Sequence, residues 1–169
     1  MSLKTQISAR LSAVLTSVLD LVTSTAPLTV SASMDWASGT GANQADKVFS
    51  DERTLSASAS ENLDLAGSLT DAFGVAITFA KVKAIAIFAA AGNTNDVVVG
   101  GAASNGFVGP FADATDAIKV KPGGFVIMAA PQAAGLGTVT GGTGDILKVA
   151  NSGGTTGVTY QTVIIGTSA

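Results

Sequence analysis

Residues 3–22 read LKTQISARLSAVLTSVLDLV, and this stretch decides how the N-terminal part of the chain is interpreted. Its large apolar residues follow one another at intervals of four and three, at Ile7, Leu11, Val14, Val18 and Leu21. That spacing places the five side chains on one face of an α-helix. We therefore expect an amphipathic helix over residues 1–26, with Ser2 as its N-cap. Pro27 ends it, because proline disfavours helical backbone at the preceding residue.

Such a helix needs a partner. A helix of about twenty residues is roughly 30 Å long and cannot bury its apolar stripe by itself. It must pack on its own β domain, on the same helix of a second copy, or on a larger assembly. We therefore predict that the five apolar residues form an assembly interface, and that residues 1–26 act as a contact arm.

The rest of the chain is typical of an antiparallel β protein. Residues 27–46 read as an extended linker and a glycine-rich loop that holds Trp36, and residues 47–169 as a β-sandwich or jelly roll. Short apolar runs recur about every ten residues between Gly, Asn and Pro turns, without helical segments between them. A shift in the alternation near Ala80–Lys83 indicates a β-bulge or a strand break. The expected strands include Thr54–Ser60, Asn62–Leu65, Val75–Phe79, Val97–Val99, Ile118–Lys121, Phe125–Ala129, Gly137–Thr140, Ile146–Ala150 and Val158–Ile165.

The composition predicts an oligomer. Charged residues make up 12% of the 169 residues, about half of the roughly 25% that is usual in soluble domains. Neighbouring subunits would cover much of a surface so poor in charge, so we expect a homo-oligomer. Leu15, Leu19 and Val22 widen the apolar stripe of the expected helix, which favours packing on a broad surface or in a trimeric bundle, and we therefore expect a trimer. The net charge of −3 and the absence of a basic stripe with aromatic residues argue against nucleic-acid binding. No apolar run approaches 18 residues and Asp20 interrupts the N-terminal one, so we expect neither a membrane span nor a signal peptide.

The inventory of reactive side chains predicts no enzyme. The chain has no histidine and no cysteine, which removes Ser-His-Asp triads, Cys-His dyads and thiolate or imidazole metal sites. Asp51, Glu52, Glu61 and Asp64 form the one carboxylate cluster. We interpret Asp51-Glu-Arg53 as a salt-bridged turn, and Glu61 and Asp64 as residues that flank the start of a strand. The oxygen-rich groups Asn93/Asn95/Asp96 and Asp113/Asp116 are interpreted as turns rather than calcium sites. We expect no catalytic residue, cofactor or metal.

Four segments resemble small structural proteins of the virions of tailed bacteriophages. They are WASGTGANQADKVFSDERTL (36–55), NLDLAGSLTDAFG (62–74), KPGG (121–124) and GDILKVAN (144–151). The N-terminal stretch lies outside this resemblance.

The resemblance implies a non-enzymatic β-rich virion protein of the capsid-decoration or tail-associated type. We expect a decoration or cementing protein that binds the assembled shell as an oligomer, with the major capsid protein as its partner, in a virion assembled in the host cytoplasm. The alternatives are a tail, connector or tail-fibre component, or a jelly-roll recognition module that binds a host glycan or protein.

Overall fold

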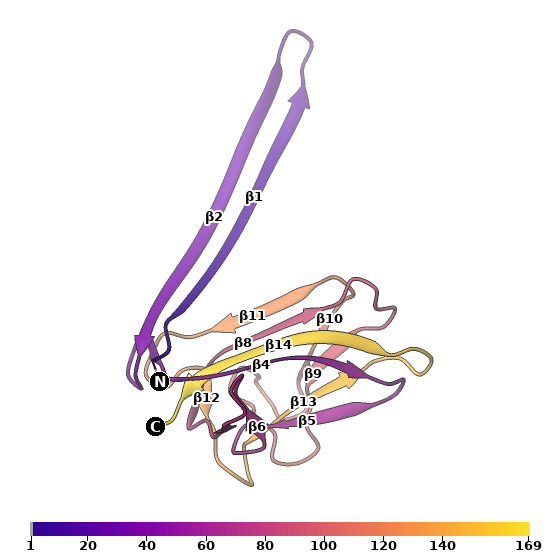
Figure 1. Ribbon diagram of the computed structural model, residues 1–169. Helices are drawn as coiled ribbons and strands as arrows, with labels where there is room; N and C mark the ends of the chain where they lie inside the picture. The colour runs from indigo at the N-terminus through magenta and orange to yellow at the C-terminus, as the bar shows by residue number, and fades with distance from the viewer. Residues whose placement is uncertain (1) are drawn as a thin grey trace.

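The computed structural model describes residues 2–169, and this part of the chain is all β, with 14 strands and no helix. Two long strands, β1 (Thr5–Val18) and β2 (Thr23–Ser38), form an antiparallel hairpin that stands away from a compact sandwich (Figure 1). We call this hairpin the arm. The short strand β3 (Gln44–Ala45) adds to β2 in parallel at the base of the arm.

The sandwich consists of two antiparallel sheets. One has the order β10-β9-β13-β5 and the other the order β11-β8-β14-β4, with β12 added to β8. Strands β4 and β14, β5 and β13, β8 and β11, and β9 and β10 pair as four nested antiparallel pairs, which is the arrangement of a jelly roll. The bounds are β4 Lys47–Leu55, β5 Ser60–Asp64, β8 Lys81–Ala89, β9 Val97–Gly100, β10 Ala117–Val120, β11 Phe125–Ala129, β12 Gly137–Thr138, β13 Ile146–Asn151 and β14 Val158–Thr167. A small hairpin of β6 (Leu69–Thr70) and β7 (Ala76–Ile77) completes the fold.

One continuous apolar core fills the space between the two sheets. Strand β14 shows how it is made: Val158, Tyr160, Thr162 and Ile164 are buried and point inward, while Thr159, Gln161 and Val163 point outward. This period-2 alternation is the reason why the sequence specifies strands here. The arm contributes nothing to this core, and its base belongs to a separate small cluster.

The predicted N-terminal helix is wrong. Residues 5–18 form strand β1, and the boundary expected at residue 26 falls inside strand β2. The residues expected as a linker also belong largely to β2, which continues to Ser38. Only the mainly β part of the expected fold class agrees with the structure.

The helical spacing was misleading because a step of four residues preserves the face of a strand as well as of a helix. Ile7 and Leu11 therefore share one face in either structure. The steps of three, from Leu11 to Val14 and from Val18 to Leu21, were the whole evidence for a helix. The decisive partner lies in β2, where apolar residues alternate strictly with Ser, Thr, Pro and Asp at positions 26–36. In the register of the hairpin, Ile7 pairs with Met34 and Leu11 with Val30.

The expected strands of the sandwich agree with the structure in most places. Phe125–Ala129 is confirmed at both ends. The strand expected at Thr54–Ser60 is wrong, because β4 ends at Leu55 and Ser58 adopts a positive φ of 58° in a turn. The bulge is confirmed, since Ile165 pairs with Ala84 and Gly166 with Val82, so that Lys83 is the extra residue.

Candidate assembly interface

The base of the arm is fixed to the sandwich by Trp36. Its side chain is 2% exposed and packs in a cluster with Ala45 and Ala84. Around this cluster lie partly buried side chains from the arm, the N-terminal segment and the sheet: Leu3, Ile7, Met34, Ala129 and Ile165. Because this indole is buried at the base, it fixes the direction in which the hairpin leaves the sandwich.

Lys83 joins the same base from the bulge in β8. Its side chain is completely buried, and its ammonium donates hydrogen bonds to the backbone carbonyls of Gly41, Pro131 and Gln132. The ammonium also lies 5.8 Å from the centre of the Trp36 ring, within the range of a cation–π contact. Burial, and to a lesser degree the neighbouring Lys81, lowers the pKa of Lys83. Since the N–H groups of this ammonium are bound to backbone carbonyls, we infer that Lys83 helps to attach the arm to the sandwich.

Beyond its base the arm has no cover. Every residue from Ser8 to Ser33 is exposed, and Leu15, for example, is 75% exposed. The arm leaves the sandwich near both chain ends and extends well past it (Figure 1). A two-stranded ribbon this exposed is marginal as an isolated structure in water.

The two faces of the arm differ in chemistry. Paired residues of an antiparallel hairpin share a face, and the register therefore collects the apolar residues on one side. This apolar face consists of Ile7, Ala9, Leu11, Ala13, Leu15, Ala26, Leu28, Val30, Ala32 and Met34, with no charged residue among them. On the opposite face near the base, Gln6 donates to Asp35 at 2.9 Å, and the hydroxyls of Ser12 and Thr29 lie 3.3 Å apart.

Toward its tip the arm also carries apolar residues on its second face, among serines and threonines. Val14, Val18 and Pro27 lie on the face opposite Leu15 and Leu28. We call residues 11–30 the distal half. Asp20, in the turn that the Leu19 N–H closes by donating to the Val22 carbonyl, is the one charged residue of this half.

The structure separates the five residues of the predicted interface. Ile7 and Leu11 lie on the apolar face, Val14 and Val18 lie on the opposite face, and Leu21 is in the tip turn with 96% of its side chain exposed. The other members of the apolar face come from β2 and were not among the predicted site residues. Their signal was the alternation of residues 26–36, which a search for helical spacing does not detect.

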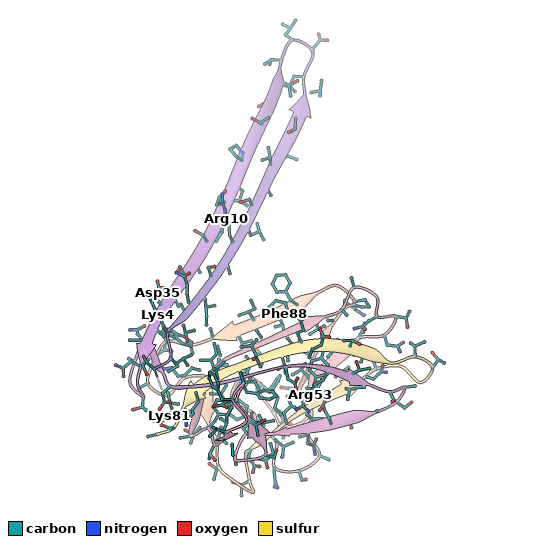
Figure 2. All side chains as sticks on the ribbon, viewed as in Figure 1. Lys4, Arg10, Asp35, Arg53, Lys81 and Phe88 are labelled. Atoms are coloured by element: carbon teal, nitrogen blue, oxygen red, sulfur yellow. The ribbon has the colours of Figure 1, made fainter. Side chains whose placement is uncertain are left out.

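The sandwich presents a second apolar surface toward the arm. The outward side chains of β11, β8 and β14 form what we call the outer sheet face: Ala84, Ala86, Phe88, Phe125, Ile127, Ala129, Val163 and Ile165. Phe88 and Phe125 stack with ring centres 5.8 Å apart, and Phe125 is 66% exposed. The base of the arm covers one end of this face, and the end with Phe88 is open (Figure 2).

A groove of about 700 Å³ lies between the arm and the outer sheet face. One wall is formed by arm residues 8–11 and 30–32, where apolar side chains alternate with Ser8, Arg10 and Ser31. The other wall is formed by Phe88, Phe125 and Ile127. Arg10 is the one charged residue in the lining (Figure 2), and among the described residues it has no ion-pair partner. The groove is thus open, with an apolar wall on the sheet and a mixed wall on the arm.

Two members of the carboxylate cluster, Asp51 and Glu61, make structural contacts. Arg53 on β4 forms ion pairs with Asp51 and with Glu61 of β5, and Glu61 accepts a hydrogen bond from the buried Tyr160 hydroxyl at 2.7 Å. Burial and this hydrogen bond raise the pKa of Tyr160 above its usual range. The residues 51–53 lie within a strand, so the turn expected for them is wrong, although the salt bridge is present. Glu61 is committed to linking the two sheets.

The oxygen-rich groups also make local contacts. Asn93 exchanges two hydrogen bonds with the backbone of Thr159, Asp96 pairs with Lys121 at 2.8 Å, and Asp113 accepts hydrogen bonds from Thr115. Backbone hydrogen bonds lower the pKa of Asp113. In residues 2–169 no three acidic side chains come together as a metal site would require.

A smaller hollow of about 300 Å³ lies between the N-terminal segment and the β6–β7 hairpin. Its carboxylates are engaged, since Asp46 accepts from Ser168 and Asp71 accepts from the N–H groups of Phe73 and Val75. From the sequence we expect Trp36 in a glycine-rich loop. The structure places it in β2 and buries it, so that expectation is wrong.

The described part of the chain contains no helix with the length and apolar character needed to span a bilayer. Comparisons with protein-family models, with curated proteins and with solved structures found no match to this chain.

Proposed function

We propose that this protein is a non-enzymatic structural protein that works as a homo-oligomer, with the arm as its contact element. The observation that carries the proposal is the exposure of the whole apolar face of the arm. An apolar ribbon projecting from a charge-poor sandwich is a solubility hazard in a free monomer and a ready surface in an assembly.

The size of the arm supports this role. Fourteen residue pairs at about 3.3 Å each, on two strands about 4.8 Å apart, give a strip of roughly 450 Å² on each face. Exposed apolar patches on monomers are rarely much larger than this and are often functional. The attachment through Trp36 and Lys83 holds the strip away from the sandwich, so that it reaches a neighbour.

We further propose that the assembly is a virion, and that the protein decorates or cements the capsid of a tailed bacteriophage, in contact with its major capsid protein. The support for this step is the resemblance of segments 36–55, 62–74, 121–124 and 144–151. Binding that requires the assembled shell would stabilise it by mass action. A tail or connector position is the alternative on the same resemblance.

The mass of the purified protein in solution tests the proposed oligomer. Light scattering after size exclusion should give a multiple of 16.6 kDa, and three copies is the expected number. A monomer at all concentrations up to the millimolar range would contradict the proposal. Counting copies per purified particle then separates capsid from tail, because a capsid position requires several hundred copies and a tail tip only a few.

A further inference from the structure

We propose that the distal half of the arm of one copy inserts into the groove between the arm and the outer sheet face of a second copy. This inference rests on the proposed homo-oligomer and names the surface that receives the arm. Its basis is that the distal half carries apolar residues on both faces, that both walls of the groove offer apolar residues to them, and that the insert and the groove carry one complementary pair of charges.

The two-sided character of the distal half is what requires two walls. Leu15 and Leu28 lie on one face, and Val14, Val18 and Pro27 lie on the other. Docking on a flat surface would cover only one of these faces. The groove offers Leu11 and Val30 on one side and Phe88, Phe125 and Ile127 on the other, so the part of an inserted arm that lies between these walls is covered on both faces.

The area buried by an inserted arm is large enough for a specific contact only if both walls of the groove take part. Eight residue pairs of the distal half are roughly 27 Å long, and their two faces together cover about 500 Å². Each contact joins the inserted arm of one copy to the groove of another and buries roughly 1,000 Å² in total, counting both copies. A specific interface is expected to bury at least about 1,000 Å² in total, and contact through one face of the distal half would bury about half of that.

The charges are complementary. Asp20 is the one charged residue of the inserted half, and Arg10 is the one charged residue of the groove lining. Neither has an ion-pair partner among the residues that the structure describes. Insertion with the tip pointing toward the base of the receiving groove brings Asp20 to Arg10, which fixes the orientation of the arm.

Site-specific cross-linking tests the contact, because the chain has no cysteine of its own. Full-length Leu15→Cys protein is mixed with a tagged Ile127→Cys protein, allowed to exchange and treated with a short bismaleimide. The matched control replaces Ile127→Cys by Asn62→Cys, at an exposed residue of the opposite sheet. We expect the mixed product with Ile127→Cys at least tenfold above that with Asn62→Cys.

A charge exchange tests the orientation. Asp20→Arg or Arg10→Asp alone should weaken self-association severalfold, and a protein carrying both changes should recover most of the loss. Equal cross-linking at residues 127 and 62, cross-linking of Leu15→Cys only to itself, or losses from the two charge changes that simply add, would overturn the inference. These results leave the proposed function intact if the protein is still an oligomer. A monomeric wild type overturns both.

Discussion

Replacing two arm leucines by serine should weaken self-association without unfolding the protein. Leu15 and Leu28 both lie on the apolar face of the arm and are 75% and 54% exposed. Full burial of a leucine side chain contributes about 1.5–3 kcal/mol. Scaled by the area still exposed in the free chain, the two residues together contribute about 2–4 kcal/mol to each docked arm. The dissociation constant of Leu15→Ser/Leu28→Ser should therefore rise by roughly 30- to 700-fold.

The same substitutions should barely change the stability of the single chain. Both side chains are in water in the isolated protein, and exposed substitutions of this kind usually change the free energy of unfolding by less than about 0.5 kcal/mol. Sedimentation velocity over a concentration series measures the association, and thermal unfolding of the dissociated protein by circular dichroism measures the stability. The matched control is Ser33→Ala, on the polar face of the same arm and outside the lining of the groove, which should leave both quantities unchanged.

Two results would refute this reasoning. If the serine variant associates as tightly as the wild type, the apolar face is not the contact surface. If its unfolding temperature falls as much as its association, the leucines belong to the packing of the single chain, and the exposed position of the arm does not describe the protein in solution.

Three further predictions concern the sandwich and the base of the arm. The pKa of Lys83 is lower in the folded protein than in the unfolded chain, where it is about 10.4. Between these two values the unfolded chain binds more protons than the folded protein, so the free energy of unfolding should rise with pH. Lys83→Met should remove this rise when urea unfolding is measured at several pH values. The pKa of Tyr160 is raised in the folded protein, so the stability that its neutral hydroxyl contributes is fully present below about pH 10 and is lost as pH rises further. Above that pH, Tyr160→Phe should lose less stability than the wild type. Equal losses would contradict the role of the Tyr160 hydroxyl in linking the sheets. In Gly166→Ala the new Cβ would lie 2.2 Å from the Lys81 carbonyl, which should destabilise the sandwich by about 1–3 kcal/mol in the same assay. Gly92→Ala, at an open turn position without a positive φ, should cost less than about 1 kcal/mol.

The sequence was informative wherever one face of a strand is buried. Phe125–Ala129 was predicted to the residue, and the shift of phase near Lys83 correctly indicated a bulge. Both signals exist because a buried face fixes the alternation, so that an extra residue leaves a visible change of phase.

The same argument explains the failure at the N-terminus. The arm is not buried in the single chain, and its distal half carries apolar residues on both faces, so Val14 and Val18 blurred the alternation and completed a helical pattern. The distinguishing information lies in pairing with β2, a contact across as many as 31 residues between Thr5 and Trp36. Local periodicity does not report contacts of that separation. The groove was beyond prediction for the same reason, since it requires knowing that the arm stands over β8 and β11.

The most direct test of the account is the mass of a protein with a shortened arm. Residues 10–31 are removed, and Ala9 is joined to its partner Ala32 through Asn-Gly, a dipeptide that favours tight hairpins. Trp36, Lys83 and the whole sandwich remain. We predict that the wild type is an oligomer in light scattering, and that the shortened protein is a folded monomer with a cooperative unfolding transition. A shortened protein that keeps the oligomeric mass of the wild type would contradict the central claim that the arm joins the copies.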